Sequence, residues 1–172
     1  MSQNWNNLAR HCLCNPTNMR TEGELNRIAS EIIAGGVAVH RVVGPGCFES
    51  AYTPCLEHEL RKRGLTFAAR VPVTIQYESL VVPRAYEVDL IVEASVVVEL
   101  KATSALGPLD ARQLLTYLRF TGCPLGLLMN FGAPTMLAGI KRLVNNFPEG
   151  TVLPGRGEVA QPEPAHEHRE KI

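Results

Sequence analysis

Three charged side chains interrupt two adjacent apolar runs of this chain, and few folds can accommodate them there. The runs are residues 88–92 (VDLIV) and 96–101 (VVVELK), and they contain Asp89, Glu99 and Lys101. Burying an unpaired charge is costly, so acids inside Val-rich strands are usually paired or bind a metal. With a tight turn between the runs, we expect a β-hairpin that places Asp89 opposite the Glu99 to Lys101 stretch, with carboxylates within roughly 5 Å of each other.

The chemistry of these three side chains indicates a metal site. Glu99 and Lys101 are two residues apart and therefore point to the same face of a strand. Carboxylate oxygens are the ligands that hard divalent cations prefer, and a lysine beside them is a point charge suited to phosphate. Such a set can hydrolyse a phosphodiester. The alternative is a buried ion-pair network with a purely structural role.

The rest of the chain alternates between helical and strand patterns. Apolar residues at three- and four-residue spacing predict helices, and runs rich in Val, Ile, Tyr and Thr predict strands. The resulting order predicts a mixed α/β sandwich around one central sheet. The predicted helices are 22–40, 48–63, 109–120 and a closing helix at 134–146, and the predicted strands are 66–77, 80–92, 96–101 and 123–131.

Length and composition indicate one cytosolic domain. A chain of 172 residues with 45% hydrophobic residues can build a single core, which we place at residues 21–147. Residues 1–20 and 148–172 lack periodicity, so we expect a disordered extension and a flexible tail. No run approaches roughly 18 apolar residues, and the N-terminus lacks signal-peptide features, so we expect a cytoplasmic protein without a membrane partner. Five scattered cysteines do not form a disulfide or zinc framework.

The charge balance permits a nucleic-acid partner without requiring one. Net charge is zero, whereas phosphate binding usually shows as a basic surplus. Residues 20–147 hold 13 Lys and Arg against 12 Asp and Glu, and without the candidate ligands Glu49, Asp89 and Glu99 the balance is 13 against 9. The tail from Pro148, with 5 acids and 3 bases, partly masks this mildly basic core.

Several separated motifs, taken together and in order, resemble the GxxExxY family of the PD-(D/E)XK nuclease superfamily. The naming motif is 46–52 (GCFESAY), and it is followed by Asp89, by 99–101 (ELK), by 113–117 (QLLTY) and by 126–131 (GLLMNF). The resemblance spans roughly residues 22 to 146. It implies a three-layer, restriction-endonuclease-like α/β sandwich with a mixed central sheet flanked by helices.

The resemblance also implies a mechanism and a site. Glu49 would join Asp89 and Glu99 around Mg²⁺ or Mn²⁺, and a metal-activated water would attack a phosphodiester of DNA, with RNA the less favoured substrate. Lys101 would orient the water and stabilise the transition state. Without the resemblance, Glu49 is equally a helix-start residue favoured by the helix dipole.

Four further residues are expected to bind substrate or to support the site. Gln113 and Tyr117 lie on one helical face, which in the similar nucleases faces the active site. They either contact the substrate or form a hydrogen-bonded pair at the sheet edge. His40 is expected to be a packed or capping histidine rather than a ligand, and Tyr52 to belong to the core or to support the site.

Two positions depart from the usual family pattern. Arg70-Val71 stands where many members have Gln-Val, and Glu87 stands where an Arg often precedes the aspartate. Neither position is a metal ligand. Glu87 nevertheless replaces a cation near the site with an anion, which predicts repulsion of phosphate.

Two other functions are compatible with the sequence. One is a catalytically inactive module that shares the nuclease fold and binds nucleic acid or a protein without cutting, because fold does not fix function. The other is a subunit of a larger complex. A homodimer is also compatible, because cutting two strands takes two sites.

Overall fold

Helices cover both faces of a single mixed sheet in the computed structural model, which describes residues 20–145. The strands follow the spatial order β1-β2-β3-β4-β5. The elements are α1 (Glu22–Val43), α2 (Glu49–Lys62), β1 (Phe67–Tyr77), β2 (Leu80–Val92), β3 (Val96–Lys101), α3 (Pro108–Thr121), β4 (Leu125–Asn130), the short 3₁₀ helix η3 (Leu137–Gly139) and β5 (Ile140–Val144).

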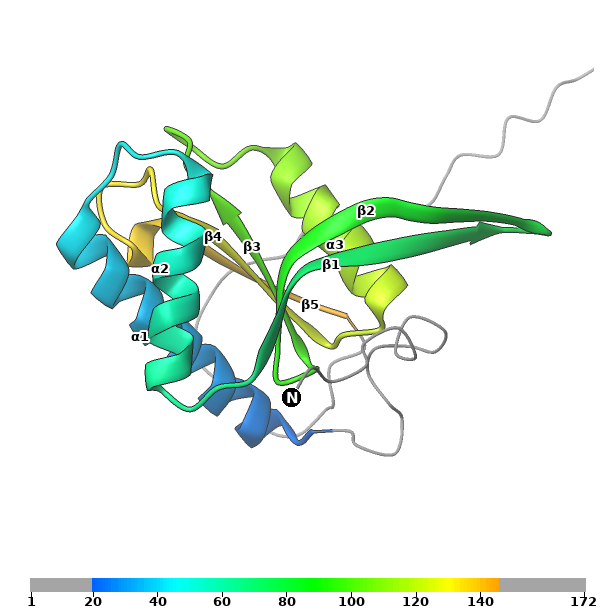
Figure 1. Cartoon of the computed structure of the whole chain (residues 1–172), viewed down its shortest axis with the longest axis horizontal. Helices are drawn as coiled ribbons and strands as arrows, with labels where there is room; N and C mark the ends of the chain where they lie inside the picture. Colours follow the sequence, from blue (N-terminus) through cyan, green and yellow to red (C-terminus); the bar gives the residue numbers. More distant parts are fainter. Residues whose placement is uncertain (1–19, 146–172) are drawn as a thin grey trace, which may run out of the picture.

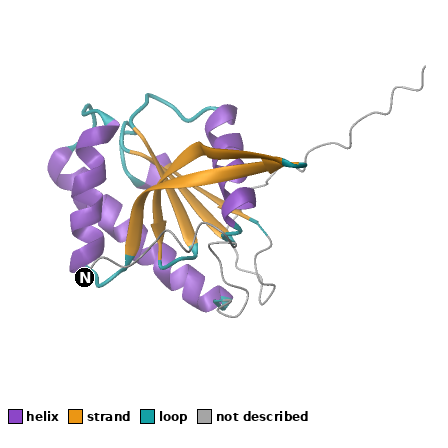
Figure 2. Cartoon of the chain, turned by 45° about the vertical axis from the view of Figure 1, so that its right-hand side comes forward, coloured by secondary structure: helices purple, strands orange, loops and turns teal. Residues whose placement is uncertain are grey.

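The connections determine the direction of each strand. β1, β2 and β3 form an antiparallel meander, α3 crosses over so that β4 lies parallel to β3, and β5 returns antiparallel to β4. α1 and α2 pack on one face of the sheet and α3 on the other, so each face has its own apolar core (Figure 2). The predicted α/β class, a three-layer sandwich with a mixed central sheet, is confirmed.

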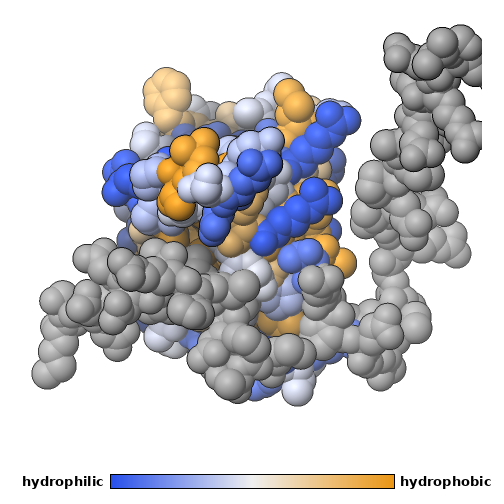
Figure 3. Space-filling model, turned by 90° about the vertical axis from the view of Figure 1, so that its right-hand side faces the viewer, coloured by the Kyte–Doolittle hydropathy of each residue, from blue (hydrophilic) through white to orange (hydrophobic). Residues whose placement is uncertain are grey.

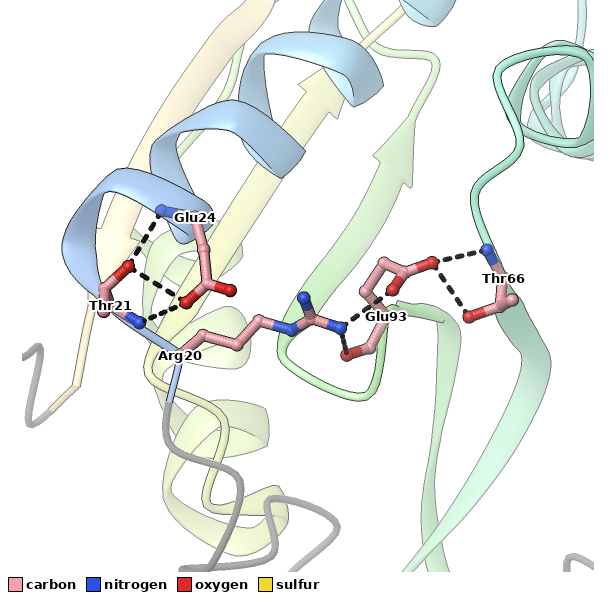
Figure 4. Close-up of polar contacts among 5 residues, drawn as sticks. All are labelled: Arg20, Thr21, Glu24, Thr66 and Glu93. Carbon is pink, nitrogen blue, oxygen red and sulfur yellow. Dashed lines mark hydrogen bonds and ion pairs between the residues drawn. The ribbon is translucent and has the colours of Figure 1, made fainter.

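Residues from two other parts of the chain stabilise the turn between β2 and β3. Glu93 and Ala94 have positive φ angles of 52° and 50°, as both central residues of a type I′ turn must. The Glu93 carboxylate accepts hydrogen bonds from the Thr66 backbone N–H at 2.7 Å and from Arg20 at 2.8 Å (Figure 4). These contacts stabilise a conformation that non-glycine residues seldom adopt. They tie the closed end of the hairpin to the chain segments before α1 and β1.

The predicted hairpin of residues 80–101 is confirmed, with Leu90 opposite Val98 and Val92 opposite Val96. The other predicted helices and strands are also confirmed, apart from the closing helix, with ends within three residues of those expected. The predicted extension, apart from Arg20, and the predicted tail lie outside the described residues. No helix between residues 20 and 145 is long and apolar enough to cross a bilayer.

The closing helix predicted at residues 134–146 is wrong. Met136, Ile140 and Leu143 have helical spacing, yet the chain forms only η3 there and then continues as β5. β4 is buried along its whole length, so the backbone groups on its outer edge need a partner strand. β5 supplies it, with Met129 opposite Ile140 and Leu125 opposite Val144. Strand pairing therefore overrides the local helical pattern.

Replacement of Gly139 by alanine should destabilise this closing segment. A Cβ at Gly139 would overlap the carbonyl oxygen of Asn130 and lie 2.9 Å from the Ala133 Cβ. Because backbone cannot move aside as a side chain can, we expect the free energy of unfolding to fall by about 1–3 kcal/mol. Urea denaturation measures it. Gly23→Ala is the matched control: it has open space in α1 and should leave stability unchanged or raise it by about 0.5 kcal/mol. Equal stability of the two variants would contradict the close approach.

Candidate active site

The candidate residues gather where β2 and β3 separate. On the N-terminal side of Leu90, β2 no longer pairs with β3. There the Asp89 side chain supplies the missing hydrogen-bond acceptor, because its Oδ2 accepts the Leu100 backbone N–H at 2.8 Å. A carboxylate thus replaces a ladder hydrogen bond that the sheet no longer supplies. This contact aims the acid of β2 toward β3, as the sequence predicted.

Glu99 and Lys101 form a buried ion pair on β3. The Lys101 Nζ donates to Glu99 Oε1 at 2.7 Å, and Glu99 is only 4% exposed. Glu99 Oε2 is buried and has no hydrogen-bond partner among the described residues. An ion pair alone does not account for that bare oxygen, nor for a second acid, Asp89, beside a single lysine. The site therefore brings two carboxyl groups together with a single ammonium group.

Burial raises the pKa of both acids. Desolvation, with the Asp89 charge second, raises the pKa of Glu99 to about 7, against the opposing effect of Lys101. Desolvation also raises the pKa of Asp89, against the Leu100 N–H and the Lys101 charge. Burial would by itself lower the pKa of Lys101, but the Glu99 hydrogen bond and the charges of Glu99, Glu49 and Asp89 raise it above its ordinary value. Lys101 is therefore fully protonated at neutral pH.

Glu49, on α2, lies near Asp89 and Glu99, but its hydrogen-bond partner is a backbone N–H group. It is the first residue of α2, it is exposed, and its Oε1 accepts the Ala102 backbone N–H at 3.3 Å. Its charge raises the pKa of both Asp89 and Glu99, so the three acids share one electrostatic field. Within residues 20–145, however, no three His, Cys, Asp or Glu side chains form a group that could hold a metal ion. Asp89 and Glu99 are brought together, and Glu49 instead holds the chain after β3.

Tyr52 determines how α2 begins. Its hydroxyl donates to the Gly44 carbonyl at 2.7 Å and accepts the Cys47 N–H at 3.1 Å, while its ring, fully buried, stacks on Phe131 at 4.5 Å. The loop before Glu49 is thereby closed around Tyr52. Tyr52 therefore belongs to the core, as expected, and its supporting role in the site stays a prediction.

His40 and the pair Gln113 and Tyr117 also have protein partners. His40 Nε2 lies 3.0 Å from the Ala133 carbonyl oxygen, a contact that ties α1 to the segment after β4 and is expected of a packed histidine. Gln113 Nε2 donates to the Tyr117 hydroxyl at 2.7 Å. Burial, followed by the charge of Glu99, raises the pKa of Tyr117, which places this pair beside the acids.

Asn130 is a supporting residue to which sequence reasoning gave no role. It is 2% exposed at the end of β4, and its amide oxygen accepts the N–H groups of Thr103 and Gly132, each at 3.0 Å. Its amide nitrogen donates to the Thr103 carbonyl at 2.8 Å. Asn130 therefore clamps the loop that follows Lys101. A polar residue ending an otherwise apolar strand was the available signal.

The two departures from the family pattern bind each other. Arg70 Nε donates to Glu87 Oε1 at 2.9 Å, and Arg84 lies 3.7 Å from the other oxygen of Glu87. The carboxylate expected to repel phosphate is therefore flanked by two guanidinium groups. Glu87 stands where similar proteins often have an Arg, and Arg70 offsets this loss of positive charge.

A family model described as the PD-(D/E)XK nuclease superfamily matches residues 26–143, which is most of the chain and nearly all of its described part. The chain belongs to the PD-(D/E)XK nuclease superfamily. Its five-stranded mixed sheet with flanking helices is the restriction-endonuclease-like arrangement of that superfamily, as the sequence predicted. Comparison with curated proteins and with solved structures found no match. Membership in the superfamily supports a nuclease-type function.

The residues of the site fit a hard divalent cation. Mg²⁺ keeps several waters and is commonly bound by only one or two carboxylates, with the substrate completing the shell. Asp89 and Glu99 supply two carboxylates, and Glu99 Oε2 is a buried acceptor without a partner among the described residues. Two acids whose pKa values are raised by burial and repulsion are also the groups that a bound cation would stabilise most.

The stability of the metal-free protein should depend on Glu99 between about pH 4.5 and 7. Folded Glu99 has a pKa of about 7, whereas in the unfolded chain it titrates near its usual value of about 4.3. Between these values the folded state binds more protons, so the free energy of unfolding should rise as pH falls, by up to about 3 kcal/mol. Urea denaturation in EDTA at several pH values measures this.

Glu99→Gln should remove most of that slope, leaving the smaller part due to Asp89, whose pKa is shifted in the same direction. Glu78→Gln, at an exposed turn, is the control and should keep the wild-type slope. A Glu99→Gln profile parallel to the wild type would show that Glu99 is not the titrating group.

Removing the Tyr52 hydroxyl should loosen the start of α2 without disturbing the core. Tyr52→Phe keeps the stacked ring and loses the bonds to Gly44 and Cys47. We expect a loss of about 1 kcal/mol in the free energy of unfolding and weaker Mn²⁺ binding in calorimetry, because Glu49 is less well placed. Tyr77→Phe, at a residue 67% exposed, should change neither quantity. Unchanged Mn²⁺ affinity in Tyr52→Phe would separate the loop from the metal site.

Proposed function

We propose that this protein is a Mg²⁺- or Mn²⁺-dependent nuclease that hydrolyses phosphodiester bonds in DNA, and less readily in RNA. The observation that carries the proposal is the buried oxygen of Glu99 that has no partner within residues 20–145, beside Asp89 and in a carboxylate whose other oxygen pairs with Lys101. The 46–52 motif and the residues that follow it in order support assignment to the GxxExxY family. A location in the cytoplasm remains a prediction of the sequence.

Each side chain has a distinct role in the proposed mechanism. Asp89 and Glu99 would hold the cation. Glu49 would complete the site by giving up its hydrogen bond from the Ala102 N–H and binding the cation instead. When bound, the ion would supply an acidified water and neutralise charge on the phosphoryl oxygens. Lys101, protonated and fixed by Glu99, would orient that water and stabilise the negative charge of the transition state.

The surroundings favour a phosphate-bearing substrate. Gln113 and Tyr117 present a hydrogen-bonding pair beside the acids, and the charge of Glu87 is balanced by Arg70 and Arg84. Cutting both strands of a duplex would require two such sites, which a homodimer or a larger complex would provide.

A catalytically inactive module that binds nucleic acid or a protein is the second candidate. It is favoured by the zero net charge and by the engagement of Glu49 with Ala102 rather than with the other acids. Such a module should bind its partner equally well with EDTA and with Mg²⁺.

Isosteric changes at the acid and at the lysine test the proposal. Asp89→Asn keeps an acceptor for the Leu100 N–H, and Lys101→Met keeps the apolar stem, so both variants should fold. Cleavage of single- and double-stranded DNA and RNA in Mn²⁺ should fall at least about 100-fold in each. In calorimetry, Mn²⁺ binding should be lost in Asp89→Asn and retained in Lys101→Met, because of these two residues only Asp89 would bind the cation.

Asp110→Asn is the matched control. It makes the same chemical change at a carboxylate that caps α3 by accepting the Gly107 N–H and is not a proposed ligand. It should bind Mn²⁺ and cleave as the wild type does. Cleavage that persists in Asp89→Asn, or in EDTA, would rule out this site. Wild-type protein that neither binds Mn²⁺ nor cleaves would favour the inactive module.

A further inference from the structure

β1 and β2 continue beyond β3 as a two-stranded arm, residues 70–87, and three aromatic rings meet where this arm joins α3 (Figure 1). The ring centroid of Tyr86 lies 5.6 Å from that of Tyr117, edge to face, and 6.5 Å from that of Phe120. We call these three residues the aromatic cluster. Tyr117 is only 3% exposed, whereas Tyr86 and Phe120 are 37% and 42% exposed. The cluster is therefore anchored in the core and open to solvent on its outer side.

The aromatic cluster adjoins the candidate active site. The Tyr117 hydroxyl lies within the electrostatic field of Glu99 and accepts the Gln113 amide N–H at 2.7 Å. Tyr86 and Phe120 are the next rings outward from Tyr117. A nucleic-acid strand with one phosphate at the acids would therefore bring a neighbouring nucleotide to these two rings.

The outer face of α3 carries positive charge beside the cluster. Arg112 and Arg119 are exposed and seven residues apart, so they lie on one side of the helix. Within residues 20–145 neither forms an ion pair, whereas both arginines of the arm pair with Glu87. Figure 3, which views the molecule from the end toward which the arm points, shows apolar surface beside strongly hydrophilic side chains. Cations next to exposed aromatic rings suit a ligand that has both phosphates and bases.

These features favour a single strand over a duplex. In a duplex each base is stacked on its neighbours, so side chains reach its faces only after unstacking. A single strand offers its base faces to aromatic rings, and this stacking does not depend on the net charge of the protein. A net charge of zero supplies little of the phosphate attraction on which duplex binding relies. Attachment of the arm to α3 explains the buried ring of Tyr117, but not the exposure of Tyr86 and Phe120.

We infer that Tyr86 and Phe120 stack on unpaired bases of a single-stranded DNA segment next to the scissile phosphate, while Arg112 and Arg119 contact its backbone. This inference rests on the proposed function, because the acids fix where the scissile phosphate lies. It adds the substrate class: the DNA strand enters the site unpaired. Partly packed rings lose little conformational freedom when a base binds, which favours this use of them.

Fluorescence anisotropy of labelled oligonucleotides of about 12 nucleotides tests the inference, with the full chain in EDTA so that binding is measured without cleavage. The wild type should bind single-stranded DNA at least about 10-fold more tightly than a duplex of the same sequence. A strand of equal length with abasic sites in place of its bases should bind at least about 5-fold more weakly than the complete strand, because it has no faces to stack.

Substitutions that remove a ring but keep an apolar side chain test the two residues. Tyr86→Leu and Phe120→Leu should each raise the dissociation constant for the single strand at least about 5-fold and leave that for the abasic strand unchanged. Tyr86→Trp keeps an aromatic face and should bind as the wild type does. Tyr77→Leu is the matched control, the same change at an aromatic residue 67% exposed at the tip of the arm, and should also bind as the wild type does. Circular dichroism confirms folding, and if Tyr86→Leu does not fold, Phe120→Leu decides.

The arginines should act through charge alone. Arg119→Gln should weaken binding of the complete and the abasic strand by the same factor and should reduce the slope of log affinity against log salt by about 1. Arg27→Gln, at an exposed residue of α1 on the other side of the sheet, is the control and should keep the wild-type affinity and slope.

Several results would overturn the inference. These are a wild type that binds the duplex or the abasic strand as tightly as the complete single strand, and a Phe120→Leu variant that binds as the wild type does. Tighter binding of an RNA strand of the same sequence would overturn the assignment to DNA.

The inference and the nuclease proposal fail separately. Protein that binds the single strand through Tyr86 and Phe120 but does not cleave it in Mn²⁺ contradicts only the nuclease. Protein that cleaves single and double strands equally well in Mn²⁺, with Phe120→Leu as active as the wild type, contradicts only the single-strand inference.

Discussion

The hydrogen bond from the Leu100 N–H to the Asp89 carboxylate holds the central part of the structure together. β2 turns away from β3 beyond Leu90, and a buried strand cannot leave a backbone N–H without a partner. Asp89, which is half-buried, fills that position with its carboxylate and so lies beside the buried Glu99. Burial of this pair of carboxyl groups raises the pKa of both acids, and Lys101 pairs with one of them.

Packing around Asp89 and Glu99 offsets the free-energy cost of holding two carboxyl groups close together away from solvent. Apolar cores on both faces of the sheet fix β3 between β2 and β4, so Glu99 cannot move out into solvent. Lys101 compensates one charge, and the loop after it is clamped by Asn130 from β4 and by Glu49 from α2. Local polar contacts thus position the ends of the strands, whereas the apolar layers supply the stability that tolerates the charges.

Sequence reasoning succeeded where a pattern had a single physical explanation. Acids inside Val-rich runs predicted the hairpin and the meeting of Asp89 with Glu99, because burial leaves few alternatives for a charge. It failed at residues 134–146, where Met136, Ile140 and Leu143 suit a helix locally but the open edge of β4 requires a strand. It also assigned no role to Asn130. The grouping of Glu49 with the other two acids stays a prediction, and in the structure Glu49 has a backbone partner.

By itself, the sequence determined the α/β class, the positions of most helices and strands, and the meeting of Asp89 with Glu99 and Lys101. These depend on periodicity and on the energetics of burying charge, which act over short stretches of chain. Only the tertiary structure decided that β5 closes the sheet, that Arg70 neutralises Glu87, and that Tyr52 organises the loop before Glu49. Each of these contacts joins segments whose partners depend on where strands end and turns bend, and no local pattern records that geometry.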